Sequence, residues 1–113
     1  MKGLKKEIFQ CVVLDTKNKI IKDEEISVGS LSASLVHPRE TFKAAIRESA
    51  AAVIFIHNHP SGDIKPSQED ILLTRRLVQA GEVIGIQVLD HIIIGDGDHF
   101  SFRDNGMIQR APQ

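Results

Sequence analysis

The sequence has no tryptophan, no tyrosine and one cysteine among its 113 residues. A single cysteine cannot form an intrachain disulfide, and nothing in the chain resembles a secretory signal or a membrane span. We therefore expect a cytoplasmic protein that does not enter a membrane. Cys11 lies in an apolar stretch, which favours a small buried side chain without a catalytic role.

An excess of positive charge is also lacking, because 14 basic and 15 acidic side chains give a formal net charge of −1. A domain that binds DNA through its phosphates gains affinity from positive charge, and a base-stacking platform needs aromatic rings. The only aromatic residues are five phenylalanines. The composition therefore predicts at most weak, non-specific DNA binding by this chain.

The length and the 42% apolar content fit one compact domain. We place it at residues 7–103, with terminal extensions at 1–6 and 104–113, and we expect the chain to be loosely held from Arg103 onward. Strand formers over 7–15, a turn at 15–18 and a second arm over 19–28 predict a hairpin. A connection of small residues over 30–36 then leads to a helix that begins at Pro38 and continues to about Ala50.

The second half of the chain alternates strand and helix patterns. Residues 51–56 are apolar without interruption, which predicts a short strand buried on both faces. A helix is expected over 68–79, ending at Ala80–Gly81, and one or two strands over 83–89 and 91–94. A tight turn at 95–98 leads to a last arm over 99–102. A helix that runs directly into a central strand indicates an α/β layer arrangement.

The most informative stretch follows the strand expected at 51–56. Side chains alternate along an extended chain, so His57 and His59 can face one point while Asn58 points away. After a turn, Ser67 suits a helix N-cap, and Asp70 three residues later gives a weaker form of the capping box. Two imidazoles and one carboxylate, with a fourth position open, are the ligand set of a catalytic zinc site. A lone histidine carries little information, but this conjunction favours a metal site.

These residues also carry a family resemblance. The pattern His-x-His, seven residues, Ser, two residues, Asp resembles the JAMM metalloprotease motif of the JAB/MPN family, and HNHPSG…PS..D with LDHIIIGDG resembles its RadC branch. The similarity covers about residues 7–102. It implies a single-domain JAB/MPN-like fold of the α/β (α+β) class, with a mixed central sheet flanked by helices. It also implies zinc ligation by His57, His59 and Asp70, and oxyanion stabilisation by Ser67. Asn58 departs from the Ser or Thr of many proteolytic members.

Hydrolysis further needs a general base, and the motif offers no obvious one. Glu7 and the pair Glu24–Glu25 are the candidates. Glu7 is favoured over Glu25, because the resemblance places the glutamate at the start of the first strand. Ser67 can act as a helix cap or as an oxyanion donor.

Asp90 and His91 interrupt an apolar strand. One of them can orient a zinc-binding histidine, or both can face the edge of the sheet.

The leading hypothesis is a zinc-dependent hydrolase of peptide or isopeptide bonds, with Zn²⁺ as cofactor and a peptide or protein as substrate. The alternative is a DNA-repair-associated or partner-binding module of a RadC-type protein without peptidase turnover. By resemblance, DNA contacts would belong to an N-terminal helical domain that these residues do not include. The intact ligand set and the near-neutral charge favour the hydrolase.

Overall fold

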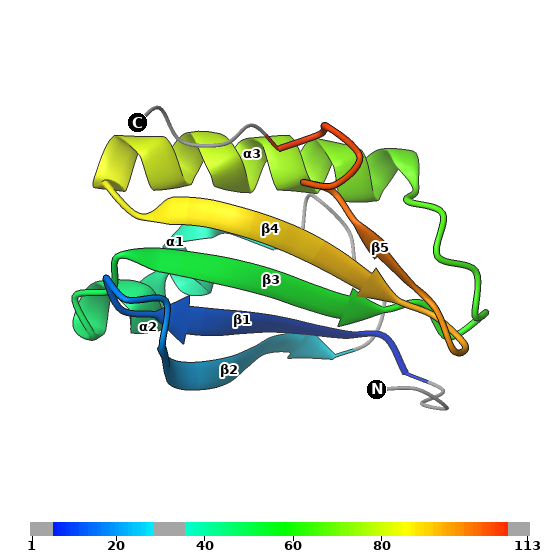
Figure 1. The fold of residues 1–113 in the computed structure, drawn as a ribbon, viewed down its shortest axis with the longest axis horizontal. Helices are drawn as coiled ribbons and strands as arrows, with labels where there is room; N and C mark the ends of the chain where they lie inside the picture. Colours follow the sequence, from blue (N-terminus) through cyan, green and yellow to red (C-terminus); the bar gives the residue numbers. More distant parts are fainter. Residues whose placement is uncertain (1–5, 29–35, 109–113) are drawn as a thin grey trace.

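The computed structural model describes residues 6–28 and 36–108 (Figure 1). Three parts of the expected regions lie outside the described residues: residues 1–5 of the N-terminal extension, 30–35 of the small-residue connection and 109–113 of the C-terminal extension. The elements, in chain order, are β1 (Ile8–Leu14), β2 (Ile20–Val28), α1 (Pro38–Thr41), α2 (Lys43–Arg47), β3 (Ala52–Asn58), α3 (Gln68–Ile84), β4 (Gln87–Ile94) and β5 (His99–Ser101).

The five strands form one mixed sheet in the order β2-β1-β3-β4-β5. Among the described strands, only the neighbours β3 and β4 are parallel, and α3 provides the crossover between them. β1 is antiparallel to β3, with Phe9 opposite His57. The start of β1 therefore lies beside the end of β3, at the edge of the sheet from which the chain leads into α3. The α+β fold class inferred from the sequence is confirmed.

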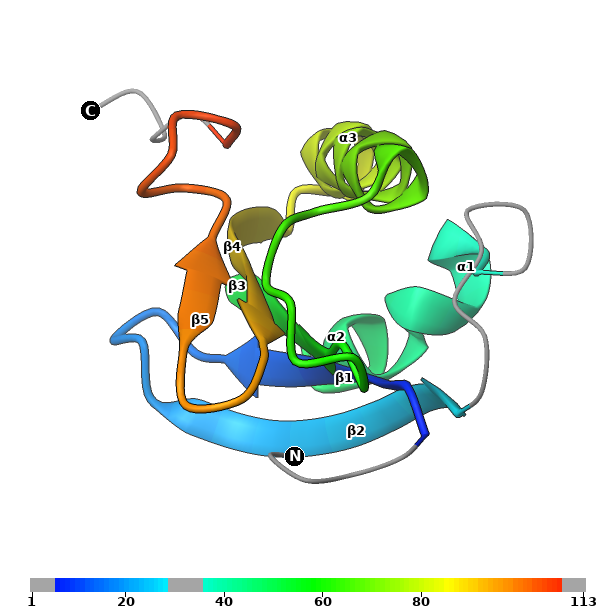
Figure 2. The same cartoon turned by 90° about the vertical axis from the view of Figure 1, so that its right-hand side faces the viewer.

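The main core lies between the helices and one face of the sheet (Figure 2). That face carries alternate side chains of the central strands, including Phe9, Val53 and Phe55, which are fully buried. On the opposite face, Ile54 and Ile56 are only half-buried and pack against a smaller cluster of strand residues. The expectation that β3 is buried on both faces therefore holds only in part for the second face, where Ala52 and Asn58 are buried but Ile54 and Ile56 are not.

The end of α3 differs from the expectation. The helix continues to Ile84, and Gly85, with φ of 77°, is its left-handed C-cap. Gly81 lies inside the helix, where an added Cβ would be 2.4 Å from the carbonyl oxygen of Ile86. The glycine at 81 thus permits a close approach of the backbone rather than ending the helix, and the strand predicted from residue 83 starts at Gln87.

Two other boundaries also need correction. The single helix expected over 38–50 is two short helices that meet at Phe42, whose ring is buried edge-on against Phe55 at a centroid distance of 5.8 Å. Ile46, an apolar residue of α2, is 55% exposed. Beyond Arg103, the chain is not loosely held throughout, because Ile108 is buried in the main core.

Cys11 is fully buried in the main core, as expected. Burial raises the pKa of its thiol to about 12, with smaller contributions from Glu24 and Asp23. None of the helices in the described part of the chain has the length and apolar character that crossing a membrane requires.

The close approach at Gly81 predicts that Gly81→Ala destabilises the domain. Alanine gains about 1 kcal/mol over glycine in a helix interior. Moving the Ile86 backbone should cost about 1–3 kcal/mol, so we expect a net loss. Urea denaturation measures it, with Glu82→Ala, at the exposed neighbouring position, as the control. A Gly81→Ala protein as stable as wild type would show that the contact is unimportant.

Candidate metal centre

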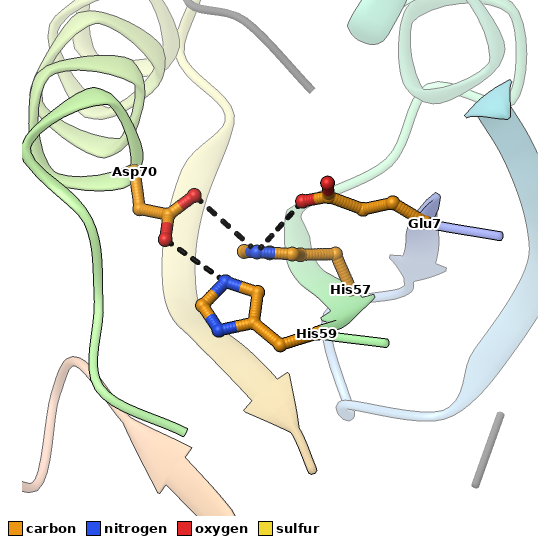
Figure 3. Close-up of side chains that lie close together, drawn as sticks. All are labelled: Glu7, His57, His59 and Asp70. Carbon is orange, nitrogen blue, oxygen red and sulfur yellow. Dashed lines mark hydrogen bonds and ion pairs between the residues drawn. The ribbon is translucent and has the colours of Figure 1, made fainter. Parts of the chain in front are cut away.

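Four acidic and imidazole side chains converge where the start of β1, the end of β3 and the first turn of α3 meet (Figure 3). One ligand atom from each lies within 4.8 Å of the others, and the four residues are Glu7, His57, His59 and Asp70. Glu7 and Asp70 approach His57 from opposite sides. The structure thus brings together all three predicted ligands and the favoured base.

Glu7 is positioned by Asn58, whose amide group binds the backbone on both sides of it. The Oδ1 atom of Asn58 accepts the Ile8 N–H at 2.6 Å, and its Nδ2 donates to the Lys6 carbonyl at 2.8 Å. Asn58 is only 2% exposed. From the sequence, Asn58 is expected only to point away from the imidazoles. Its function depends on the pairing of β1 with β3, which no local pattern reveals.

Asp70 is held by the first turn of α3. Its N–H donates to the Ser67 hydroxyl at 3.0 Å, and its Oδ2 accepts the Ser67 N–H at 2.8 Å, which completes a capping box. Burial raises the pKa of Asp70, but the adjacent His57 and the Ser67 N–H outweigh that effect and hold the pKa well below its usual range. Asp70 is therefore a fixed, ionised acceptor at neutral pH.

His59 is oriented by the turn that follows β3. Its Nδ1 lies 2.8 Å from the Asp63 carbonyl oxygen, which only accepts, so Nδ1 carries the proton. Its Nε2 lies 3.0 Å from Oδ2 of Asp70. Gly95 lets its backbone approach this turn closely, because a Cβ there would be 2.3 Å from the Gly62 carbonyl oxygen. His59 therefore presents Nε2 to the cluster.

His57 is fully buried, and its Nε2 is the centre of the group. This atom lies 3.4 Å from Asp70 Oδ1 and 3.7 Å from Glu7 Oε1, and it has no hydrogen-bond partner in the described part of the chain. A buried polar atom left unpaired is costly. Two imidazole nitrogens facing carboxylate oxygens are donors that divalent transition metals prefer. The residues present therefore fit a bound cation.

The two polar residues that interrupt β4 have different roles. His91 is fully buried, and its Nε2 lies 2.6 Å from Nδ1 of His57, while its Nδ1 lies 2.6 Å from the Thr74 hydroxyl. Burial, together with the nearby His57, lowers the pKa of His91 well below its usual value. Asp90 instead binds the Ser101 hydroxyl and the Arg103 N–H. Of the two, His91 is the one that contacts a predicted ligand.

Sequence reasoning missed Thr74, although one signal was present. It lies four residues after Asp70, on the helix face that also carries Leu73 and Leu77, and all four are buried. A hydroxyl on an otherwise apolar stripe needs a polar partner. The alternative base, Glu25, is exposed on β2 opposite Gln10 and does not belong to the cluster.

Comparison with known proteins gives a consistent result. Residues 1–107 match the family described as the RadC-like JAB domain. The chain is 58% identical over 108 residues to a UPF0758 protein of Clostridioides difficile, covering 96% of this chain and 46% of that protein. Similar relatives are the UPF0758 proteins of Methanosarcina mazei (57% over 109 residues, 96% and 48%) and Trichlorobacter lovleyi (62% over 104 residues, 92% and 45%). The chain spans about half the length of these curated relatives.

Asn58 makes hydrogen bonds to the backbone on both sides of Glu7, which we call the Asn58 clamp. It predicts that Asn58→Ala loosens the start of β1. Removing both bonds leaves a partly buried N–H and carbonyl unpaired, at a cost of about 1–3 kcal/mol. Hydrogen exchange at the Ile8 amide should accelerate more than exchange elsewhere in β1. Asn105→Ala, which removes a bond to the Ser101 carbonyl in an exposed turn, is the control. Unchanged exchange at Ile8 in Asn58→Ala would contradict the clamp.

Proposed function

The chain belongs to the family of RadC-like JAB domains, and on that premise we propose that it is a zinc-dependent hydrolase of peptide or isopeptide bonds. The observation that carries the proposal is the unpaired Nε2 of buried His57, placed between the carboxylates of Asp70 and Glu7. A structural role alone gives no reason to bury these groups together, because carboxylates and imidazoles lose hydration on burial.

His57, His59 and Asp70 are the residues that would hold the metal. Both histidines present Nε2 to the cluster, and the capping box fixes the carboxylate of Asp70. Three protein ligands are typical of a catalytic zinc site, which keeps a position for water or substrate. A zinc ion bound there would polarise the amide carbonyl and lower the pKa of its water to about 7.

Glu7 is the better general base of the two carboxylates. Asp70 is 4% exposed at its side chain and accepts the Ser67 N–H, and its lowered pKa makes it a weak proton acceptor. The Glu7 side chain is 22% exposed and lies 3.7 Å from His57 Nε2, so it borders both the cluster and solvent. Glu7 would take a proton from the attacking water and return it to the leaving nitrogen.

Ser67 can combine the two roles considered from the sequence. Its hydroxyl accepts the Asp70 N–H, which uses an oxygen lone pair and leaves the hydroxyl proton to be donated. Ser67 is exposed and is hydrogen-bonded to Asp70 of the cluster. We assign it the donation of a hydrogen bond to the carbonyl oxygen as negative charge develops there.

The substrate class we propose is a peptide or protein, which supplies the amide carbonyl that this site would attack. DNA binding through this domain should be weak and non-specific, since the net charge is −1. A DNA-repair or partner-binding role without turnover would leave the polar cluster unexplained, so we place it second. Because the relatives are about twice as long, the activity of the whole protein is part of the proposal.

The ligand assignment predicts about one zinc per chain after reconstitution and dialysis. His59→Ala and Asp70→Asn should each lower zinc content sharply, because each removes one of three protein donors. Elemental analysis measures the content, and circular dichroism checks the fold. His99→Ala, an exposed histidine outside the cluster, is the matched control. Zinc that survives loss of both His59 and Asp70 would refute the assignment.

The base assignment predicts that Glu7→Gln retains zinc but loses hydrolysis about 100-fold or more. The amide keeps the size of the side chain but cannot take up a proton. Cleavage is followed by mass spectrometry of a peptide and isopeptide library, with and without a chelator. Glu25→Gln, on β2, should cleave like wild type. Full activity in Glu7→Gln, or its loss in Glu25→Gln, would contradict the assignment.

A further inference from the structure

A continuous chain of buried hydrogen bonds lies behind the cluster. The Thr74 hydroxyl donates to the Asp70 carbonyl at 2.7 Å and lies 2.6 Å from His91 Nδ1. His91 Nε2 in turn lies 2.6 Å from His57 Nδ1. The exposed fractions of Thr74, His91 and His57 are 3%, 0% and 0%. Because these side chains are buried, the protons in these hydrogen bonds must come from the three side chains themselves.

Only one assignment of donors and acceptors places a proton in each of these hydrogen bonds. A carbonyl oxygen only accepts, so the single hydroxyl proton of Thr74 belongs to the bond with Asp70. The Thr74 oxygen must then accept from His91, which puts the His91 proton on Nδ1. A neutral imidazole has one N–H, so His91 Nε2 is an acceptor and receives Nδ1–H of His57.

We propose that Thr74 and His91 are positioning residues that fix the tautomer of His57, so that the lone pair of Nε2 faces Asp70 and Glu7. The inference rests on the proposed metal site and deepens it. A metal ligand must offer a lone pair, and the bond made by the other ring nitrogen sets the tautomer. The opposite tautomer of His57 would point an N–H to the place where a cation would bind.

The ring of His91 is itself held in place. It stacks on Phe102 at a centroid distance of 4.6 Å and an interplanar angle of 4°, and it meets Phe9 edge-on at 5.7 Å. These contacts prevent the ring from turning away from His57 without repacking the core. His59 reaches the same result more simply, through its bond to the Asp63 carbonyl.

The tautomers can be measured directly by long-range ¹H–¹⁵N correlation of the imidazoles. In metal-free and zinc-loaded wild-type protein, we expect a proton on Nδ1 of both His57 and His91 and none on Nε2 of His91. A neutral His57 protonated on Nε2, or His91 with a bare Nδ1, would overturn the proposal. This spectrum is informative even if the protein hydrolyses nothing or binds no zinc, so it separates this inference from the proposed function.

Zinc affinity tests the consequence, by competition with a chromophoric chelator. Thr74→Val keeps the shape but removes the hydroxyl, and we expect affinity to fall about 10- to 100-fold. Thr74→Ser restores the hydroxyl and should restore affinity to within a few-fold. Thr41→Val is the matched control, because the buried Thr41 hydroxyl also donates to a carbonyl four residues earlier but lies outside the cluster.

The zinc affinities of the three variants, taken together, test the positioning role of Thr74. A loss in Thr74→Val that Thr74→Ser reverses and Thr41→Val does not share supports the positioning role. Equal zinc affinities in Thr74→Val and Thr41→Val would overturn it, as would a loss that Thr74→Ser fails to reverse in a folded protein. Urea denaturation of each variant shows whether the proteins compared are folded.

Discussion

The site depends on one electrostatic constraint, the unpaired nitrogen of a buried histidine placed between two carboxylates. His57 Nε2 lies within 4 Å of both Asp70 and Glu7 and has no hydrogen bond among the described residues. Two carboxylates this close to one nitrogen repel each other when no positive charge lies between them. Burial also removes part of their hydration, and without a cation nothing compensates for that loss. A bound cation would relieve both costs.

The pairing of the strands and the position of α3 bring these groups together, and a few hydrogen bonds then hold them. Because β1 is antiparallel to β3, the residue before β1 lies beside the end of β3. Because α3 crosses over to the parallel strand β4, its first turn starts at that same edge. Hydrogen bonds of Asn58 then hold the backbone on both sides of Glu7, and the N–H of Ser67 donates to the carboxylate of Asp70. The arrangement follows the general tendency of α/β sheets to form sites beyond the carboxyl ends of strands.

Features that depend on short sequence patterns could be predicted, and those that depend on tertiary contacts could not. The spacing of His57 and His59 and the capping residues before Asp70 are local, and the structure brings these groups together with Glu7. The clamp by Asn58 and the chain through Thr74 join residues from different elements. The end of α3 differs from the expectation because Gly81 resembles a helix terminator in sequence, whereas in the fold it permits the close approach of the Ile86 backbone. The family resemblance was confirmed over residues 1–107.

The central claim is that His57, His59 and Asp70 hold a zinc ion while Glu7 does not bind the ion and instead moves a proton. Anomalous diffraction at the zinc edge, from crystals of zinc-loaded protein, tests it most directly. The account predicts one strong peak about 2.0–2.2 Å from Nε2 of both histidines and from an Asp70 oxygen, with Glu7 beyond bonding distance. A peak bonded to His57 through Nδ1, a direct bond to Glu7, or no peak at this site would contradict it.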